Sequence, residues 1–281
     1  MIWRSLLYVP AVSERFLAKA QSRGADALIL DLEDSVPPDR KSEARRLLMR
    51  CWPDLVKGPS DLLVRINGGL LEAARDIETA VRPGLRALYV AKAESAATLA
   101  WIAEALDEME FLQGMERGSV GLVPLLETPE AVEAAFAIAA APRVMALSLG
   151  SEDLATACGM APGLEQLRFA RQRVVMAAAA AGVAPLGLLE SVARFDPEGR
   201  IELVRTSRAF GFRGASTVHP DGIAALNEGF LPTQDERDWA MAVIAALDKA
   251  QHEGRGAARL RDRMIDQPMR LRAEAILTNK R

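Results

Sequence analysis

Short apolar runs alternate with longer stretches of helical periodicity over the first 220 residues of the chain. Eight such runs end in polar or turn-forming residues, at 6–10, 27–33, 62–67, 87–92, 121–127, 145–150, 185–191 and 214–219. The clearest helical segments between them are 14–24, 129–141 and 164–182. This alternation is typical of βα units, and eight units predict an α/β fold of the (β/α)8 TIM barrel type. An open doubly wound sheet is the alternative fold, but the chain lacks the glycine-rich dinucleotide fingerprint typical of that fold.

The pattern changes after His219. Residues 235–251 predict one amphipathic helix, which 254–257 interrupts before a basic stretch and a last short helix. We therefore predict a barrel domain at 1–225 and a C-terminal helical extension at 226–281. From these residues alone, the extension could serve as a packing brace, as an oligomer contact or as a lid over a functional site.

Composition narrows the classes of partner. A net charge of −3 provides no basic excess to neutralise a phosphate backbone, which argues against nucleic acid. The most apolar long segment, 131–149, is interrupted by charged residues and a proline, and the apolar N-terminus is too short for a signal peptide, so no membrane contact is expected. Cys51 and Cys158 lack metal-ligand spacing, which favours a reducing, cytoplasmic setting.

Polar residues gather where the predicted strands end. In a barrel of this type the chemistry lies at the carboxyl ends of the strands, so these residues are interpreted together. Several carboxylates with few histidines or thiols suit a hard divalent cation, above all magnesium. The residues are Asp31, Glu33, Asp34, Arg65, Asn67, Lys92, Glu94, Glu127, Glu152, Asp153 and His219.

Glu127 and Asp153 are the best candidates for direct metal ligands. They follow neighbouring strands, whose axes lie about 5 Å apart, and magnesium commonly takes one or two protein carboxylates. Each could instead cap the helix that follows it, since both segments are also reasonable helix starts. Their occurrence together with the other strand-end residues favours the metal site.

The cationic candidates each have a structural alternative. Arg65 lies inside an apolar strand and requires a carboxylate or phosphate partner, which could be a substrate or a strand-two carboxylate. Lys92 could simply pair with a nearby glutamate, and His219 could be a general base or a hydrogen-bonded core residue. Arg15 and Lys19 share one helix face, where they could hold a phosphate or merely face solvent.

A series of motifs in order along the chain resembles one known family. The motifs are RSLLYVP, DLEDSVPPDRKSEAR, VRIN, VPLLETPEAV, LGSEDLA, GFRGASTVHP and GRGAARLRDRMIDQP. They resemble the citrate lyase β-subunit-like family, metal-dependent carbon–carbon lyases of acyl-CoA esters that include malyl-CoA and citramalyl-CoA lyases. The resemblance covers nearly the whole chain.

The resemblance implies a role for several residues. It implies Mg²⁺, with Mn²⁺ as a possible substitute, on Glu127 and Asp153, and a substrate carboxylate or keto oxygen on Arg65. It implies that Asp266, on the lid of a neighbouring subunit, is the general acid/base, and hence a homo-oligomer, a trimer or a hexamer. The positions implied to contact coenzyme A are Tyr8, Arg15, Lys19, Val218 and His219.

The reaction that the resemblance implies is a Claisen-type cleavage, or its reverse, of a 3-hydroxyacyl-CoA dicarboxylic ester such as malyl-, citramalyl- or citryl-CoA. Alternatives are the β subunit of a citrate lyase complex acting on an acyl-carrier-protein thioester, a malyl-CoA thioesterase, or a non-catalytic CoA-binding subunit. Retention of Arg15 and Lys19 favours free coenzyme A. The sequence does not name the ester, the keto acid or the favoured direction.

Two further expectations concern the surroundings of the metal. Glu33 and Asp34 are expected to accept hydrogen bonds from metal-bound water and from Arg65, with Lys92 close by. Val36, Pro37 and Pro38 are expected to end the second strand and fix an extended loop at the rim. The chain departs from the family pattern at Gly187, where an aspartate is usual in the seventh strand, and at Ala215, Ala91 and Asp262.

Overall fold

The computed structural model describes residues 3–191 and 196–278. The chain forms two compact units, Met1–Asn227 and Glu228–Arg281, and each is treated by itself below. In the first unit, eight strands pair in the order β7-β6-β5-β4-β3-β2-β1-β8, and every pairing between them is parallel. The strands are β1 (Ser5–Pro10), β2 (Ala27–Asp31), β3 (Asp61–Ile66), β4 (Leu85–Val90), β5 (Gly121–Leu126), β6 (Ala146–Leu149), β7 (Ala184–Leu186) and β8 (Ala215–Thr217).

A bridge between Leu186 and Gly214 joins the two ends of this sheet. The Gly187 N–H donates to the Gly214 carbonyl at 2.8 Å, and the Arg213 N–H donates to the Pro185 carbonyl at 2.9 Å. Gly214 is required at this seam because a Cβ there would lie 1.8 Å from the Trp3 carbonyl oxygen. The sheet therefore closes, and the predicted (β/α)8 barrel is confirmed.

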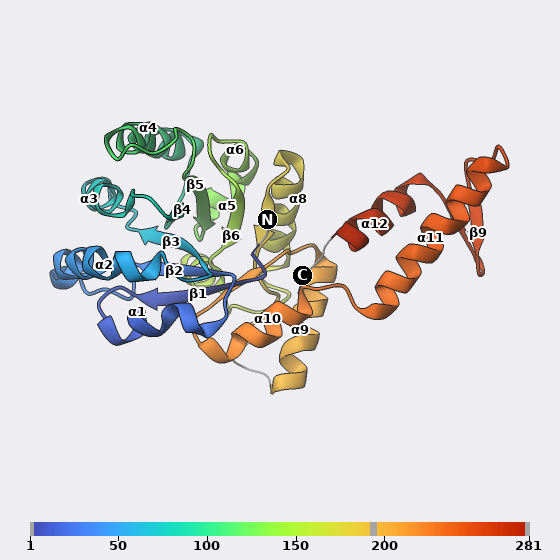
Figure 1. Ribbon diagram of the computed structural model, residues 1–281, viewed down its shortest axis with the longest axis horizontal. Coiled ribbons are helices and arrows are strands. Elements are labelled where there is room, and N and C mark those ends of the chain that lie inside the picture. Colours follow the sequence, from blue (N-terminus) through green and yellow to red (C-terminus); the bar gives the residue numbers. More distant parts are fainter. Residues whose placement is uncertain (1–2, 192–195, 279–281) are drawn as a thin grey trace. The chain divides into compact units, whose positions relative to one another are not determined.

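The helices lie outside the strands, as α1 to α4, α6 and α8 do around β1 to β6 in Figure 1. The α-helices of this unit are α1 (Glu14–Ala20), α2 (Lys41–Leu55), α3 (Leu70–Ala80), α4 (Ala96–Leu112), α5 (Pro129–Glu133), α6 (Ala135–Ala139), α7 (Ser151–Ala157), α8 (Arg168–Ala181), α9 (Pro197–Phe210) and α10 (Ile223–Gly229). Short 3-10 turns are η1 (Gln21–Arg23), η2 (Pro38–Arg40) and η4 (Pro220–Gly222).

Three expected elements differ from the prediction. The expected helix 129–141 is broken at Ala134, because Arg173 takes the Val132 and Glu133 carbonyls as hydrogen-bond acceptors at 2.8 and 2.7 Å. The helix expected from residue 164 begins only at Arg168. The seventh apolar run was expected to be a strand over 185–191, but the pairing residues are Ala184–Leu186 and the chain then leaves the sheet.

Inward-facing side chains of alternate residues fill the barrel. They form one buried cluster, with positions two apart on a strand on the same face, as the pleat requires. Arg65 and Asp31 continue this inward row at the carboxyl ends of β3 and β2. The cluster is Trp3, Leu6, Ala27, Ile29, Leu63, Ala87, Tyr89, Val123, Leu125, Ala146 and Leu186, with Tyr8 packed against it.

The second unit is a helix pair with a hairpin. Helix α11 (Gln234–His252) contains the predicted helix 235–251 and begins at a capping box made by Thr233 and Glu236. The expected basic stretch forms an antiparallel hairpin of β9 (Ala258–Leu260) and β10 (Arg263–Ile265), followed by α12 (Gln267–Thr278). Its core is Ala240, Val243, Leu247, Ile265 and Ala273. Within the described residues of both units, no helix is long and apolar enough to cross a membrane.

Candidate active site

A buried arginine is the centre of the polar residues at the carboxyl ends of the strands. Arg65 donates from Nε to Asp31 Oδ1 and from Nη2 to Asp31 Oδ2, both at 2.7 Å. Its Nη1 lies 3.0 Å from Glu33 Oε2 and 3.3 Å from Asp34 Oδ2. The guanidinium also lies over the Tyr8 ring, 4.9 Å from its centroid.

Strand register places this pair together. Asp31 and Arg65 are direct partners in the β2–β3 pairing. Asp31 also accepts the N–H groups of Glu33 and Ser35, at 2.9 and 3.2 Å, so it organises the turn that carries the other acids. The sequence left open whether Asp31 faces the pocket or a helix; it faces Arg65, and the salt bridge weighed as an alternative for Arg65 is present.

The ion pair shifts the pKa of both partners. Burial acts to raise the pKa of the Asp31 carboxyl, but the hydrogen bonds and charge of Arg65 outweigh burial and hold it below its ordinary value. The pKa of Arg65 is raised, because its bonds to Asp31 outweigh the opposing effect of burial. Both shifts therefore favour the charged forms of the two groups.

Glu127 is a buried carboxylate with one oxygen left over. It follows β5 and is 2% exposed. Its Oε1 accepts the Lys92 N–H at 2.7 Å, whereas Oε2 is buried without a hydrogen-bond partner in the described part of the chain. Gly150 provides the room for this carboxylate, since a Cβ at Gly150 would lie 2.8 Å from Glu127 Cβ and Oε2.

The environment of Glu127 disfavours its charge. The pKa of Glu127 is raised to about 7, first by burial and then by the negative charges of Asp153 and Glu33, against the lowering effects of the Lys92 N–H and of Arg65. Asp153 is exposed in the first turn of α7 and lies close enough for its charge to act on Glu127. A buried, partly compensated carboxylate beside a second one is a natural cation site.

Lys92 lies between the acids. Its side chain contacts Glu33, with Nζ 3.3 Å from Oε1, while its backbone N–H donates a hydrogen bond to Glu127. The pKa of Lys92 is raised, chiefly by the charge of Glu33. Lys92 has a φ of 50°, a left-handed conformation that costs a non-glycine residue about 1 kcal/mol and is common near functional sites.

The carboxylates fit a magnesium ion. Glu127 Oε2 is an orphaned buried acceptor, and Asp153 makes no hydrogen bond or ion pair within the described residues. Among the described residues there is no group of three or more histidine, cysteine, aspartate or glutamate side chains placed to hold a metal. Two protein carboxylates are sufficient for magnesium, which keeps its remaining positions for water and substrate oxygens.

The residues expected at coenzyme A lie in separate places. Arg15 and Lys19 are exposed on α1, which three residues separate from the carboxyl end of β1. Val218 and His219 are exposed after β8 and line a cavity of about 350 Å³ together with Ser216, Thr217 and other residues of this end. Tyr8 packs against the core cluster of the barrel, with the Arg65 guanidinium over its ring.

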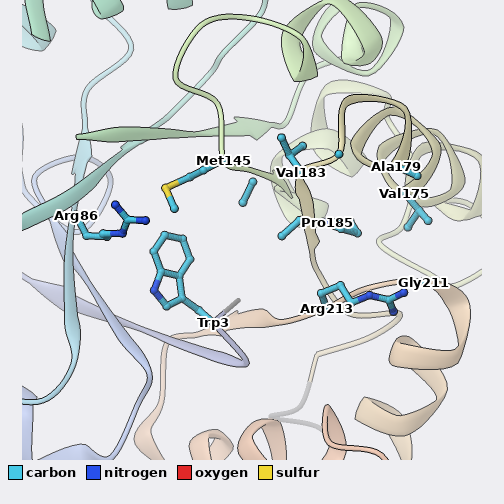
Figure 2. A pocket seen from close by; sticks show the side chains of 12 residues that line it. Trp3, Arg86, Met145, Val175, Ala179, Val183, Pro185, Gly211 and Arg213 are labelled. Atoms are coloured by element: carbon cyan, nitrogen blue, oxygen red, sulfur yellow. The ribbon is translucent and has the colours of Figure 1, made fainter. Parts of the chain in front are cut away.

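A second cavity of about 430 Å³ lies at the opposite, amino-terminal end of the strands. Figure 2 shows Trp3, Met145 and Pro185 around it, with Arg86 on one side and Arg213 on the other. Neither Arg65 nor any of the acids described above lines this cavity. It is therefore distinct from the strand-end residues.

Asp266 belongs to the second unit. It immediately precedes α12 and its backbone carbonyl accepts the Arg270 N–H at 3.1 Å. The neighbouring Ile265 is 2% exposed and anchors the segment in the core of this unit. The Asp266 side chain is half-buried and makes no hydrogen bond or ion pair within the described residues, so its carboxylate is available to a ligand.

The departures from the family pattern have structural counterparts. Gly187 faces Phe212, whose ring would lie 2.7 Å from a Cβ at that position. The seventh-strand residue inside the barrel is Leu186, so the interior is apolar there. Ala215 and Ala91 are buried, and Asp262 is exposed with Arg259 as its partner at 3.4 Å.

Sequence reasoning left the role of Asp31 open and did not consider Tyr89 or Gly150. Asp31 and Tyr89 each lie two residues after an inward-facing strand residue, and this spacing is the signal that could have found them. Gly150 had no such signal, because only the placement of Glu127 shows why a side chain is excluded there.

Fold and site together define a closed (β/α)8 barrel with an acid-rich cation site beside a buried arginine, a class that contains metal-dependent lyases. Residues 4–220 match the model of the HpcH/HpaI aldolase/citrate lyase family, and the chain belongs to this family. Human mitochondrial citramalyl-CoA lyase is 31% identical over 98% of this chain and 84% of that protein. The citrate lyase subunit beta of Escherichia coli K12 is also 31% identical, over 98% of this chain and 92% of that protein.

Solved structures of related proteins agree with this family assignment. CitE from Mycobacterium tuberculosis, in complex with magnesium, acetoacetate and coenzyme A, superposes with a TM-score of 0.76 at 30% identity, covering 98% of this chain and 97% of that one. A citrate lyase from Burkholderia xenovorans LB400 shares the fold, with a TM-score of 0.80 at 21% identity over 98% of this chain and 90% of that one. The expectation of a carbon–carbon lyase of this family is confirmed.

We predict that Asp31→Asn destabilises the protein by about 3 kcal/mol at pH 7, because it removes the negative charge that balances the buried Arg65 guanidinium. A carboxyl whose pKa is lowered on folding stabilises above its unfolded pKa and loses that contribution as the pH falls through the folded value. The difference from wild type should therefore shrink below about pH 4. Urea unfolding at pH 7 and pH 3.5 measures it.

Asp34→Asn is the matched control, since Asp34 also contacts Arg65 but its side chain is 56% exposed. It should cost less than about 0.5 kcal/mol. Equal losses in the two variants would show that Asp31 has no special part in holding Arg65.

We predict that Glu127→Gln stabilises the metal-free protein at pH 8 by about 1 to 3 kcal/mol. The raised pKa of Glu127, about 7, means that the folded protein loses stability as this carboxyl ionises between about pH 4.5 and 7. Glutamine retains the acceptor for Lys92 without the charge. The gain should vanish near pH 4.5, and added Mg²⁺ should raise the Tm of wild type only.

Thermal unfolding with EDTA and with Mg²⁺ provides both measurements. Glu130→Gln, an exposed change three residues away, should behave as wild type in each. Loss of stability in metal-free Glu127→Gln at pH 8 would contradict the description of Glu127 as a strained, unsatisfied carboxylate.

Proposed function

We propose that the protein is a magnesium-dependent lyase that cleaves, or forms by Claisen-type condensation, the carbon–carbon bond of a 3-hydroxyacyl-CoA dicarboxylic ester. The products of cleavage are a keto acid and an acyl-CoA. One observation carries the proposal: the buried carboxylate of Glu127 keeps an unsatisfied oxygen in the same strand-end site as the buried Arg65. Glu127 has an oxygen free for a cation, and the Nη1 group of Arg65, which Asp31 does not occupy, can also meet an anionic substrate.

Glu127 and Asp153 are the residues that would hold the ion. A bound magnesium supplies Lewis-acid stabilisation of negative charge on the substrate oxygens. Glu33 and Asp34 would accept hydrogen bonds from its water ligands, and Lys92 keeps Glu33 in place through their contact at 3.3 Å. Magnesium accompanies acetoacetate and coenzyme A in the CitE structure, which supports the choice of ion and of substrate class.

Arg65 would bind the carboxylate or keto oxygen of the keto-acid part. Asp31 occupies its Nε and Nη2, so Nη1, whose contacts to Glu33 and Asp34 are longer, is the donor that can be shared with a substrate. A guanidinium held in this way is preorganised and adds a fixed positive charge beside the oxygens on which charge develops.

Coenzyme A would follow the rim of the barrel. Arg15 and Lys19, exposed on α1, are available to its phosphates, and Val218 and His219 line the cavity at the end of β8. Tyr8 supports Arg65 and would meet only the reactive end of the substrate. Retention of both α1 cations favours free coenzyme A over a carrier-protein thioester, although the β subunits of citrate lyase are equally similar relatives.

Asp266 would move the proton. In cleavage, the Asp266 carboxylate accepts the hydroxyl proton as the hydroxyl carbon becomes the keto carbon and the carbon–carbon bond opens, and Asp266 then returns that proton to the α carbon of the acyl-CoA enolate. In condensation, the same carboxylate removes the α proton and passes it to the oxygen of the new hydroxyl group. We propose that Asp266 comes from a neighbouring subunit, in a homotrimer or a hexamer, within the cytoplasm.

The proposal is tested by incubating the purified protein with Mg²⁺ and malyl-, citramalyl-, methylmalyl- or citryl-CoA and measuring keto acid release. We expect turnover of at least one ester and none after EDTA treatment. Release of free coenzyme A without an acyl-CoA product would indicate a thioesterase. Tight binding of coenzyme A with no turnover of any ester would overturn the lyase proposal.

We predict that Asp266→Asn lowers cleavage by at least 100-fold, the usual contribution of a positioned general acid, and leaves the Mg²⁺-induced rise in Tm unchanged. The control is Asp262→Asn in the same hairpin, whose side chain is 98% exposed. It should retain normal turnover. Near-normal activity of Asp266→Asn would refute the role of Asp266 and leave the metal site untouched.

A further inference from the structure

A second orphaned polar atom lies inside the barrel. The hydroxyl of Tyr89 is buried and has no hydrogen-bond partner among the residues that the structure describes, and the whole residue is 0% exposed. A buried hydroxyl without a partner costs about 1 to 3 kcal/mol, so an apolar residue would serve the fold better here. The roles assigned above to Arg65, Glu127 and Asp266 do not use this group.

Tyr89 is placed directly beside the residues of the site. It is the partner of Arg65 in the β3–β4 pairing and shares the inward face of the barrel with it. Its ring meets the Tyr8 ring edge-on, with centroids 6.0 Å apart, while the Arg65 guanidinium lies over that same Tyr8 ring. The pKa of Tyr89 is raised, mainly by burial, and it also responds to the charges of Arg65 and Glu127.

No acceptor among the described residues meets the Tyr89 hydroxyl with full hydrogen-bond geometry. The hydroxyls of Ser148 and Tyr8 lie close to it and lower its pKa. The charged groups that act on it are Arg65 and Glu127, the carboxylate whose free oxygen has been assigned to the metal ion. A ligand held by Arg65 and by that ion would bring anionic oxygens to the same place.

We propose that Tyr89 is a substrate-binding residue, whose hydroxyl donates a hydrogen bond to a carboxylate or keto oxygen of the keto acid. This inference rests on the proposed function, because it takes the keto acid as the ligand between Arg65 and the metal ion. Tyr89 thus forms the floor of the subsite for the keto acid and has no part in binding coenzyme A. The hydroxyl favours ligands that place an oxygen next to it. A ligand with an apolar group at that place would leave the buried hydroxyl unpaired and would bind more weakly.

The test is Tyr89→Phe, which removes only the hydroxyl and keeps the ring contact with Tyr8. Calorimetric titration of the Mg²⁺-loaded protein with pyruvate and with oxaloacetate should show Kd values raised about tenfold, the value of one hydrogen bond to a charged acceptor. The Kd for coenzyme A should not change. The Tm of the metal-free variant should equal or exceed that of wild type, since an unsatisfied donor is removed.

Ser60→Ala is the matched control, because the buried Ser60 hydroxyl is satisfied by the Ala25 carbonyl at 2.7 Å. It should lower the Tm and leave both keto acid affinities unchanged. Unchanged keto acid affinity in Tyr89→Phe would overturn the inference, as would a fall in its Tm as large as that of Ser60→Ala. Failure of wild type itself to bind either keto acid would overturn the proposed function as well.

Discussion

The buried charge of Arg65 is the constraint on which the site depends. A guanidinium inside a barrel is tolerable only if carboxylates meet it, and its side chain, 10% exposed, contacts three of them. Asp31 does this with both oxygens and at the same time holds the turn after β2 through two backbone N–H groups. The positions of Asp31, Glu33 and Asp34 at the end of β2 are therefore tied to the position of the Arg65 guanidinium.

The same pair leaves the rest of the site with an excess of negative charge. Asp31 takes two of the donor groups of Arg65, so the remaining acids share the third, Nη1, and the ammonium group of Lys92. Five carboxylates against two cations leave a formal balance of −3, and the charges of Asp153 and Glu33 add to burial in raising the pKa of Glu127. A divalent cation would compensate this excess of negative charge, and the Asp31–Arg65 ion pair is thereby linked to the proposed metal site. The residues counted are Asp31, Glu33, Asp34, Glu127, Asp153, Arg65 and Lys92.

The sequence was sufficient for the barrel, and it also suggested the candidate metal carboxylates, because both follow from local order: an apolar run predicts a strand, and the polar residue after it lies at the catalytic end. It was insufficient where neighbours in space decide. Arg173 breaks the helix at Ala134 by capturing carbonyls from another helix. Which acid holds Arg65 depends on the register of two strands, and the need for glycine at 150 appears only once Glu127 is placed.

The inward positions of the barrel are apolar at β7 and more polar from β1 to β4, and this asymmetry bears on how the proposed substrate can lie. Tyr8, Asp31, Arg65 and Tyr89 bring polar groups inward from β1 to β4, whereas β7 contributes Leu186, which is 1% exposed. A carboxylate against Leu186 would lose its hydration without compensation. The charged end of a substrate must therefore turn toward Arg65, and its long thioester arm can leave past the cavity at the end of β8. The orientation of the proposed substrate follows from which parts of the barrel interior can stabilise a buried charge.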